Sequence, residues 1–359
     1  MKTNISTKPL VGKVVHTLAQ NGTANTVKTS TKPVISVNGN GSDISSNEII
    51  FARNKRKLIT QKITLSLIDV AKKKGHTDSV KEYWNTFNCL GVVISDGERI
   101  YGKYCKNRIC TVCSGNRKAE LINKYLPEIN QWKEPYFVTL TIKSVPARRL
   151  NAMMRAVLRG LGLIIGKYKT RKKRGKDFKL KGIRSLECNF NPVTKTYNPH
   201  FHIIVPDEQT ATILVNEWLY YCNRKKDLFW ASKYAQDKRK IYDNETCLVE
   251  VIKYGSKIIT RPKVEDNVKN EIPAKIYVSA LHNILRAMKG LRLFERFGFN
   301  LPKGQKDNIT KHLSEYDTLK YDNQTFDWID TESELRLSSY VLPPELRTLL
   351  DCNIDNHIE

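Results

Sequence analysis

The sequence predicts an α+β fold, an antiparallel β-sheet with helices packed on one face. The clearest observation is a pair of adjacent stretches with strand character, residues 182–190 and 197–205. Residues 136–142 (YFVTLTI) add a third strand because they are rich in β-branched side chains. Neighbouring strands that are followed by helices are typical of this fold class.

Helices are predicted from the spacing of apolar residues. Between Pro146 and about Tyr168, Leu, Met, Val and Ile recur at the spacing of one helix face. Helical patterns also cover residues 48–74, 208–223 and 246–259. These segments would supply the layer that covers the sheet.

The charge of the chain is strongly positive and unevenly distributed. Its 61 Lys and Arg residues exceed its 36 Asp and Glu residues, which gives a net charge of +25. Residues 315–359 hold eleven acids and three bases, so the rest of the chain carries +33. This excess indicates a polyanionic partner. Nucleic acid is favoured over a membrane because no basic amphipathic helix dominates the chain.

Composition divides the chain into four segments. Residues 1–47 are polar and basic without apolar periodicity, and they are expected to be disordered. Residues 48–130 form a helical region that carries a cysteine cluster, and residues 131–300 form the main domain. Residues 301–359 form an acidic C-terminal segment.

No part of the sequence is predicted to enter or cross a membrane. No apolar stretch approaches the ~18 residues that a transmembrane helix needs. The first residues, MKTNISTKPL, lack the apolar core of a signal peptide. A cytoplasmic location is therefore expected.

Three cysteines lie close together in the stretch YCKNRICTVC. Cys105, Cys110 and Cys113 have the spacing C-x4-C-x2-C, which in a reducing compartment indicates a metal site rather than disulfides. Zn²⁺ takes four protein ligands in a structural site. The cluster therefore predicts a structural zinc ion that needs one further ligand.

The register of a predicted hairpin favours Cys89 as that fourth ligand. Asp96-Gly97 is a residue pair that favours a type I′ turn. A two-residue turn at this pair would bring Cys89 beside Cys105 on the partner strand. His76 is the alternative ligand.

The stretch YNPHFHIIV, residues 197–205, carries two histidines on one face of a predicted strand. Side chains alternate along a strand, so His200 and His202 point to one side while the apolar side chains point to the other. One face is apolar, and the other carries two imidazoles.

A carboxylate is predicted to join the two imidazoles. If the strands at 182–190 and 197–205 pair through a turn centred on Thr194-Lys195, Glu187 lies across from His202. Two histidines and one carboxylate leave coordination positions open, as a catalytic divalent cation needs. A slip of one residue in the register would turn Glu187 to the other face.

The densest basic stretch is KYKTRKKRGKDFKLK, with nine bases between Lys167 and Lys181. It is either a solvated loop without a specific task or a phosphate-binding segment. The positive charge of the whole chain favours phosphate contacts. The candidate DNA-binding residues are Lys169, Arg171, Lys172, Lys173, Arg174 and Lys176.

The segment CLVEVIKYGSKII, residues 247–259, is predicted to form an amphipathic helix. Its apolar stripe would face the sheet. Glu250, Tyr254 and Lys257 gather on the opposite side. By itself this is the pattern of an ordinary exposed helix face, but it also puts a tyrosine where a substrate can reach it.

Together these motifs resemble a known family. In chain order they are CKNRICTVC, a TLT-type strand, HFH after Tyr and Pro, and a helix that bears Tyr254. Their order and spacing are similar to those of the rolling-circle replication initiators of small bacterial plasmids. These belong to the HUH endonuclease superfamily, and the resemblance covers roughly residues 85–300. Glu250, one helical turn before Tyr254, matches a sub-branch with a glutamate in place of a second tyrosine. Thr111 departs from the proline that this sub-branch commonly has there.

The resemblance implies a fold, a chemistry and a set of site residues. Residues 131–300 would form an HUH nuclease domain with a palm-like fold, preceded by a zinc-binding hairpin and loop. The two histidines would bind Mg²⁺ or Mn²⁺. Tyr254 would nick DNA and leave a 5′-phosphotyrosyl link and a free 3′-OH, assisted by Lys257. Glu250 would activate the water that ends the reaction.

Other functions stay open at the level of sequence. A single-tyrosine transposase or a relaxase shares the same chemistry, and a zinc-containing DNA-binding regulator would use the histidines only structurally. An initiator would bind a replication origin with a single-stranded or hairpin nick site. Host helicase and polymerase and a second copy of the chain are further candidate partners.

Overall fold

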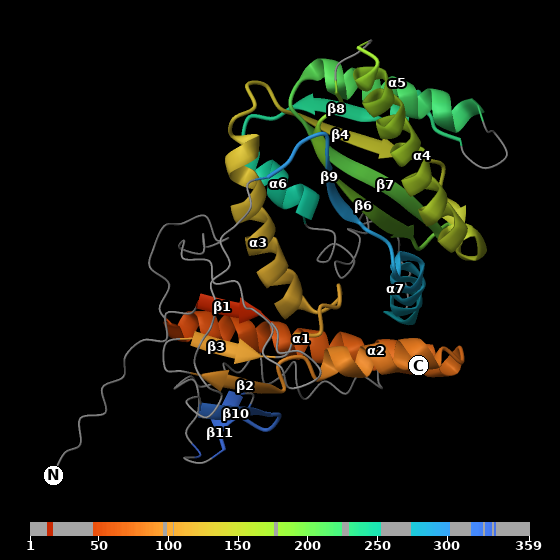
Figure 1. Ribbon diagram of the computed structural model, residues 1–359. Helices are drawn as coiled ribbons and strands as arrows, with labels where there is room; N and C mark the ends of the chain where they lie inside the picture. Colours follow the sequence, from red (N-terminus) through yellow and green to blue (C-terminus); the bar gives the residue numbers. More distant parts are fainter. Residues whose placement is uncertain are drawn as a thin grey trace, which may run out of the picture. The chain divides into compact units, whose positions relative to one another are not determined.

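The computed structural model describes most of the chain between residues 46 and 301, with short segments on either side. The described residues are 13–16, 46–95, 99–102, 104–175, 179–224, 230–252, 274–301, 317–325, 327–331 and 334. The chain divides into two compact units (Figure 1). The first comprises residues 1–119 with most of the chain from 303 onward, and the second comprises residues 120–302.

The first unit combines two helices with a five-stranded sheet (Figure 1). Helix α1 (Ser46–Lys73) packs on α2 (Thr77–Phe87). The strand order is β1-β3-β2-β10-β11, and all neighbours are antiparallel except β1 and β3. The strands are β1 (Lys13–His16), β2 (Val92–Ser95), β3 (Arg99–Gly102), β10 (Asp317–Asp322) and β11 (Asp327–Asp330). The acidic C-terminal segment thus adds two strands beside the predicted hairpin.

The connection between β2 and β3 is longer than the two-residue turn that the sequence suggested. Ser95 pairs with Ile100, so residues 96–99 separate the last paired positions. The register is shifted by two residues. Each side chain keeps its predicted face because strand side chains alternate. Asp96 and Gly97 themselves lie outside the described residues.

The second unit is built on a six-stranded sheet in which every pair of strands is antiparallel. The strand order is β8-β4-β7-β6-β9, and β5 pairs with the start of β7. The strands are β4 (Tyr136–Thr141), β5 (Val145–Pro146), β6 (Gly182–Asn191), β7 (Thr196–Val205), β8 (Asp237–Lys240) and β9 (Phe294–Phe297). The predicted α+β class is confirmed, and the three predicted strands are β4, β6 and β7.

Helices cover both faces of this sheet, so the prediction of helices on one face is incomplete. The helices are α3 (Thr111–Ile129), which begins in the first unit, α4 (Ala147–Lys173), α5 (Glu208–Arg224), α6 (Asn244–Ile252) and α7 (Ala274–Met288). Helices α4, α5 and α7 pack on the face that carries Leu140 and Phe201. The end of α3 and α6 pack on the other face, because Phe137, Ile183 and Ile204 make that part apolar. The rest of this second face is polar.

Two helices differ from their predicted bounds. Helix α4 continues to Lys173, beyond about Tyr168, so the first part of the basic stretch is helical. Helix α6 is described only to Ile252, and the later residues of the helix predicted at 246–259 lie outside the described part of the chain. None of the helices in the described residues is both long and apolar enough to span a bilayer.

The register of β6 and β7 differs from the predicted one by two residues. Glu187 pairs with His200, and Ser185 pairs with His202, whereas the predicted turn put Glu187 across from His202. The shift is even, so Glu187 still shares a face with both histidines.

The turn between these strands explains the shift. Oδ1 of Asn191 accepts hydrogen bonds from the backbone N–H groups of Val193 and Thr194, at 2.9 and 3.1 Å. This side-chain-capped turn closes a loop of four residues, 192–195, in place of a two-residue turn. Lys195 completes the loop with a φ of 53°.

Candidate functional site

Glu187, His200 and His202 lie together on the sheet face that α6 partly covers. They occupy the polar part of this face. Nε2 of His200 lies 3.8 Å from Oε2 of Glu187, and Nε2 of His202 lies 3.6 Å from the same oxygen. The two imidazole rings are nearly perpendicular, and their centroids are 4.9 Å apart. Glu187 is 3% and His200 is 6% exposed. We call these three residues the histidine cluster.

Both histidines are held through the ring nitrogen that faces away from the carboxylate. Nδ1 of His200 lies 3.0 Å from the carbonyl oxygen of Asn198, to which it can only donate. Nδ1 of His202 lies 3.4 Å from Oγ1 of Thr139, its pairing partner on β4. A proton on Nδ1 of His200 leaves a lone pair on Nε2, and this is the form of histidine that coordinates a metal.

The spacing of the histidine cluster fits a divalent cation. One ligand atom from each residue lies within 4.8 Å of the other two. An octahedral ion bound about 2.1 Å from three ligands on one side would hold them about 3 Å apart. The separations of Oε2 of Glu187 from the Nε2 atoms of the two histidines, 3.8 and 3.6 Å, are slightly wider than this. The remaining positions would stay open for water or a phosphate oxygen.

Helix α6 lies on the same face of the sheet as the histidine cluster. Its side chains Leu248 and Val251 are buried in the apolar core that covers this face. Glu250 is half-buried on α6. Tyr254 and Lys257 lie outside the described residues, and Tyr254 is two positions beyond Ile252, where the description of α6 stops.

The predicted DNA-binding residues are located at the end of helix α4. Lys169, Arg171, Lys172 and Lys173 occupy its last turns, Arg174 is its C-cap, and Lys176 lies outside the described residues. Because α4 packs on the opposite face of the sheet, the structure does not bring these bases next to the histidine cluster. The guanidinium of Arg171 lies over the ring of Tyr168, 5.6 Å from its centroid.

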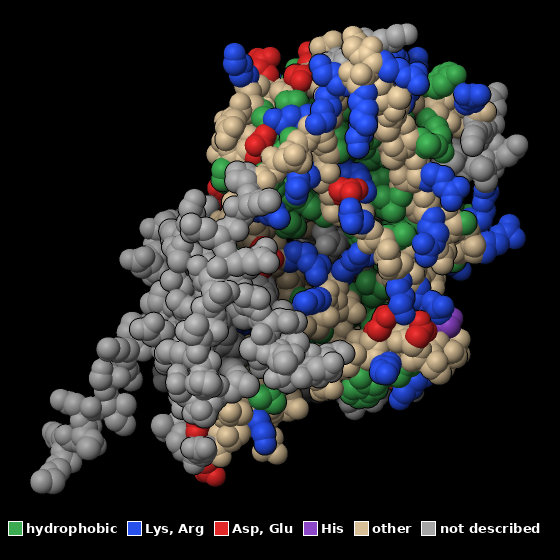
Figure 2. All heavy atoms as spheres, in the orientation of Figure 1, with side chains coloured by type: hydrophobic (Ala, Val, Ile, Leu, Met, Phe, Trp, Pro, Cys, Tyr) green, Lys and Arg blue, Asp and Glu red, His purple; other side chains and the backbone are tan. Residues whose placement is uncertain are grey.

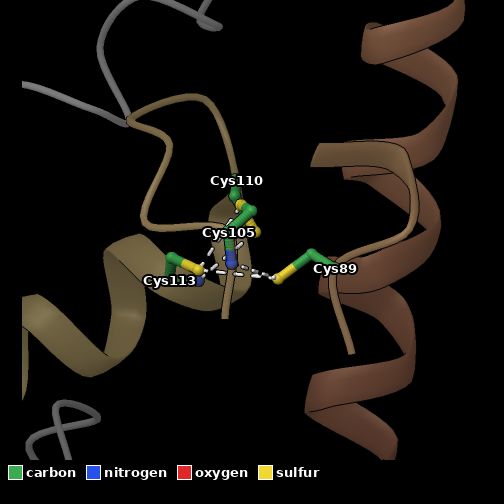
Figure 3. Close-up of side chains that lie close together, drawn as sticks. All are labelled: Cys89, Cys105, Cys110 and Cys113. Carbon is green, nitrogen blue, oxygen red and sulfur yellow. Dashed lines mark hydrogen bonds between the residues drawn. The ribbon is translucent and has the colours of Figure 1, made fainter. Parts of the chain in front are cut away.

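Four cysteine sulfurs converge in the first unit (Figure 3). Cys89 follows α2, Cys105 and Cys110 lie after β3, and Cys113 lies in the first turn of α3. Sγ of Cys113 is 3.6 Å from Sγ of Cys89 and 3.7 Å from Sγ of Cys105. Sulfurs bonded to one Zn²⁺ at about 2.3 Å would lie about 3.8 Å apart in a tetrahedron, so the spacing fits zinc. Among the described residues, His76 is not part of this group.

Backbone donors surround these sulfurs. The N–H groups of Cys105, Asn107 and Cys113 donate to the sulfurs of Cys89, Cys105 and Cys110 respectively, each at 3.4 Å. Hydrogen bonds among the thiols, first with Cys105, hold the pKa of Cys110 well below its usual range and raise the pKa values of Cys89 and Cys113. Backbone N–H donors favour the thiolate, which is the form that binds a metal.

The C-terminal hairpin packs against the cysteine cluster. Nε1 of Trp328 on β11 donates to the carbonyl oxygen of Leu90 at 2.8 Å, and Trp328 shares a buried core with the cysteines. Nζ of Lys57 donates to the carbonyl oxygen of Cys89 at 2.7 Å and lies 4.4 Å from the ring centroid of Tyr321 on β10. Burial lowers the pKa of Lys57 to about 8, while the nearby cysteines raise it.

Sequence motifs alone did not identify Thr139, Lys57 or Trp328 as residues of these sites. Thr139 is in the TLT motif, and pairing that strand with the histidine strand would have found it. Nothing in the sequence distinguishes Lys57 from the other bases of α1. Trp328 is separated from Leu90 by most of the chain, so only the folded structure brings them together.

Sequence similarity links the chain to proteins named Protein rep. It is 29% identical over 156 residues to Protein rep of Streptococcus pneumoniae serotype 2 (strain D39 / NCTC 7466), which covers 40% of this chain and 46% of that protein. It is 29% identical over 168 residues to Protein rep of Staphylococcus aureus, which covers 43% of this chain and 69% of that protein. The chain is therefore similar in sequence to Rep proteins over part of its length. This confirms, at the level of the family, the resemblance that the motifs predicted.

A third Rep relative, from Bacillus amyloliquefaciens, is 24% identical over 197 residues, which covers 47% of this chain and 57% of that protein. The chain thus spans about half the length of the first Rep relatives that it matches, 46% and 57%. No family model matches the chain, and no solved structure is a significant match.

Proposed function

We propose that the chain is a rolling-circle replication initiator of a bacterial plasmid, which nicks and rejoins one DNA strand at an origin. One observation carries the proposal: Glu187, His200 and His202 converge on the sheet face where α6 packs, and Tyr254 comes two positions after Ile252 of α6 in the sequence. Similarity to Rep proteins supports the same function. The antiparallel sheet with its helices is compatible with an HUH fold. An initiator acts on plasmid DNA, so we expect the protein in the cytoplasm.

The histidine cluster would hold Mg²⁺ or Mn²⁺ through Glu187 and the Nε2 atoms of both histidines. The bound cation would polarise a phosphate oxygen and offset the charge that develops in the transition state. The chain keeps these ligands oriented, because Asn198 and Thr139 hold the Nδ1 sides of the two rings. Outer contacts of this kind set ring orientation in metal sites.

Tyr254 is the proposed nucleophile. Its phenolic oxygen attacks the scissile phosphorus, the bond from phosphorus to the 3′ oxygen breaks, and that oxygen leaves with a proton as a free 3′-OH. The 5′ end stays joined to Tyr254, which conserves the bond energy for later rejoining. A tyrosine is almost wholly protonated near neutral pH, so Lys257 is proposed to favour the reactive phenolate.

Glu250 is the proposed general base that ends the cycle. It would take a proton from a water molecule that attacks the phosphate of the second cleavage, in place of a second tyrosine. If α6 continues to Tyr254, the spacing of four residues puts both side chains on one helix face, about 6 Å apart at Cβ. This role for Glu250 follows from the resemblance to the sub-branch that has a glutamate one helical turn before a single tyrosine.

The remaining predicted groups have supporting roles in this proposal. The cysteine cluster would hold a structural Zn²⁺, because four thiolates leave no open position for substrate. The bases at the end of α4 would contact DNA phosphates away from the histidine cluster. Host helicase and polymerase would act on the free 3′ end, and a second copy of the chain is a further candidate partner.

Nicking of supercoiled DNA tests the proposal. Purified protein is added to a plasmid that carries the origin, with and without Mn²⁺, and the products are separated before and after protease treatment. An initiator gives open circles that carry covalently bound protein, and only with the cation. Intact supercoils at every cation concentration would favour the alternative of a DNA-binding regulator. Replication of an origin plasmid in a host without other initiators would then separate an initiator from a transposase or a relaxase.

A further inference from the structure

Strand β8, Asp237–Lys240 (DKRK), is an edge strand with four exposed residues. Because strand side chains alternate, neighbouring bases on β8 point to opposite faces of the sheet. Nζ of Lys238 donates to Oε1 of Glu208 at 2.8 Å and to Oγ1 of Thr212 at 2.9 Å, both on α5. Helix α5 packs on the face opposite the histidine cluster. Lys238 therefore points away from that cluster.

Arg239, the next residue, points to the face that carries the histidine cluster. Its pairing partner on β4 is Phe137, and its guanidinium carbon lies 4.8 Å from the centroid of the Phe137 ring. The Phe137 ring centroid in turn lies 5.2 Å from that of His202, with 36° between the ring planes. Three planar groups, Arg239, Phe137 and His202, thus follow one another across β8, β4 and β7.

Arg239 also lies near Cys247 on α6. Burial raises the pKa of Cys247 on α6 to about 12, while the positive charge of Arg239 lowers it and the carboxylate of Glu250 raises it. Both charged groups are therefore close to Cys247. Lys238 is paired with Glu208, but no carboxylate among the described residues forms an ion pair with Arg239. Figure 2 shows many Lys and Arg side chains over the visible surface of the second unit, so charge alone does not single out Arg239.

We infer that Arg239 binds a backbone phosphate of single-stranded DNA, next to the phosphate that the histidine cluster receives. The inference rests on the proposed function. The Phe137 ring covers one face of the guanidinium and leaves its planar N–H donors for a phosphate, whose geometry they match. Because this ring separates Arg239 from His202, the bound phosphate is a flanking one and not the one that is cleaved. Arg239 therefore holds the strand in place and takes no part in breaking the bond.

Arg239→Ala and Lys238→Ala form a matched pair, because each removes one positive charge from β8 but from opposite faces. Binding is measured by fluorescence anisotropy with a labelled oligodeoxythymidylate, without divalent cation, so that no cleavage is needed. Arg239→Ala is expected to weaken binding roughly tenfold at low salt and to lower the salt slope by about 0.7, the value for one phosphate contact on a single strand. Lys238→Ala is expected to change both quantities much less. Arg239→Lys should fall between wild type and Arg239→Ala, because it keeps the charge but loses the planar donors.

Equal losses of affinity in Arg239→Ala and Lys238→Ala would overturn the inference, since the effect would then be one of net charge. Thermal unfolding of both variants reports whether either has lost its fold. In single-turnover nicking, Arg239→Ala should raise the DNA concentration for half-maximal rate and leave the maximal rate nearly unchanged. A fall in the maximal rate alone would contradict the flanking position. If wild-type protein binds the oligonucleotide but never nicks DNA, the proposed function fails while the affinity comparison still tests Arg239.

Discussion

Glu187 and His200 face each other directly across strands β6 and β7, with Oε2 of the glutamate 3.8 Å from Nε2 of the histidine. His202 is the diagonal neighbour in the same hairpin and lies at 3.6 Å from the same oxygen. A single hairpin therefore supplies all three candidate ligands. Their geometry depends on the register of this hairpin, and single substitutions can test it.

His200→Ala combined with His202→Ala should abolish metal-dependent nicking, with a loss of roughly 100-fold or more, because two of the three ligands are removed. Binding of duplex DNA should stay nearly unchanged, because it depends on Lys and Arg contacts to phosphate. Nicking is measured on supercoiled origin DNA over a range of Mn²⁺ concentrations. Glu187→Gln should raise the Mn²⁺ concentration needed. An unaltered Mn²⁺ titration in that variant would mean that another residue is the third ligand.

Thr139→Val should raise the metal concentration needed for nicking by roughly 10-fold, because Oγ1 of Thr139 no longer holds Nδ1 of His202. Thr139→Ser keeps the hydroxyl and is the matched control. The maximal rate at saturating Mn²⁺ should recover in Thr139→Val. If valine and serine behave alike, the contact at 3.4 Å does not orient the ring.

Cys113→Ser should remove a tightly held zinc ion and lower stability by several kcal/mol, because metal binding is coupled to folding in such sites. Zinc is measured by elemental analysis of the purified protein, and stability by urea unfolding. Cys89→Ser should have the same effect, and His76→Ala should keep the zinc. Cys222→Ser is a control, because Cys222 is buried in the other unit, away from the cluster. A full zinc content in Cys89→Ser would exclude it as a ligand.

Trp328→Phe should destabilise the first unit by about 1–3 kcal/mol, because the buried carbonyl oxygen of Leu90 loses its donor at 2.8 Å. Leu90 follows Cys89 directly, so release of zinc to a chelator should also become faster. Unfolding by urea and the rate of zinc transfer to a coloured chelator measure the two effects. A destabilised variant with an unchanged rate of zinc release would show that the hairpin does not affect how tightly the cysteines hold zinc.

Tyr254→Phe removes only the phenolic oxygen, so it should bind DNA normally but give neither a nick nor a covalent adduct. Glu250→Ala should still nick and form the adduct, and it should accumulate that adduct because the second cleavage is not hydrolysed. Both products are resolved on denaturing gels with labelled DNA. Loss of the first nick in Glu250→Ala would assign Glu250 to activation of the tyrosine or to metal binding. Normal termination would point to Tyr254 of a second copy.

Local patterns in the sequence were sufficient to predict the polar and apolar faces of the strands and the grouping of the cysteines. The alternation in YNPHFHIIV assigns both histidines to one side whatever the loop length, because strand side chains repeat every second residue. For the same reason, an error of two residues in the register of β6 and β7 left Glu187 on the face of both histidines, and Cys89 still joins the predicted cysteine group. The alternation of side chains depends only on neighbouring residues, so the sequence is sufficient to predict it.

Other features depend on contacts between distant segments, which form only in the folded chain. The loop of four residues after β6 follows from the side chain of Asn191, a detail that turn propensity alone did not predict. Helices α3 and α6 cover part of the second face because Phe137, Ile183 and Ile204 must be buried, and this set forms only when three strands align. Trp328 reaches the cysteine cluster, and Arg239 reaches the histidine face, only after the sheets have formed. Burial and strand order are properties of the assembled sheet, so no single segment of the sequence carries them.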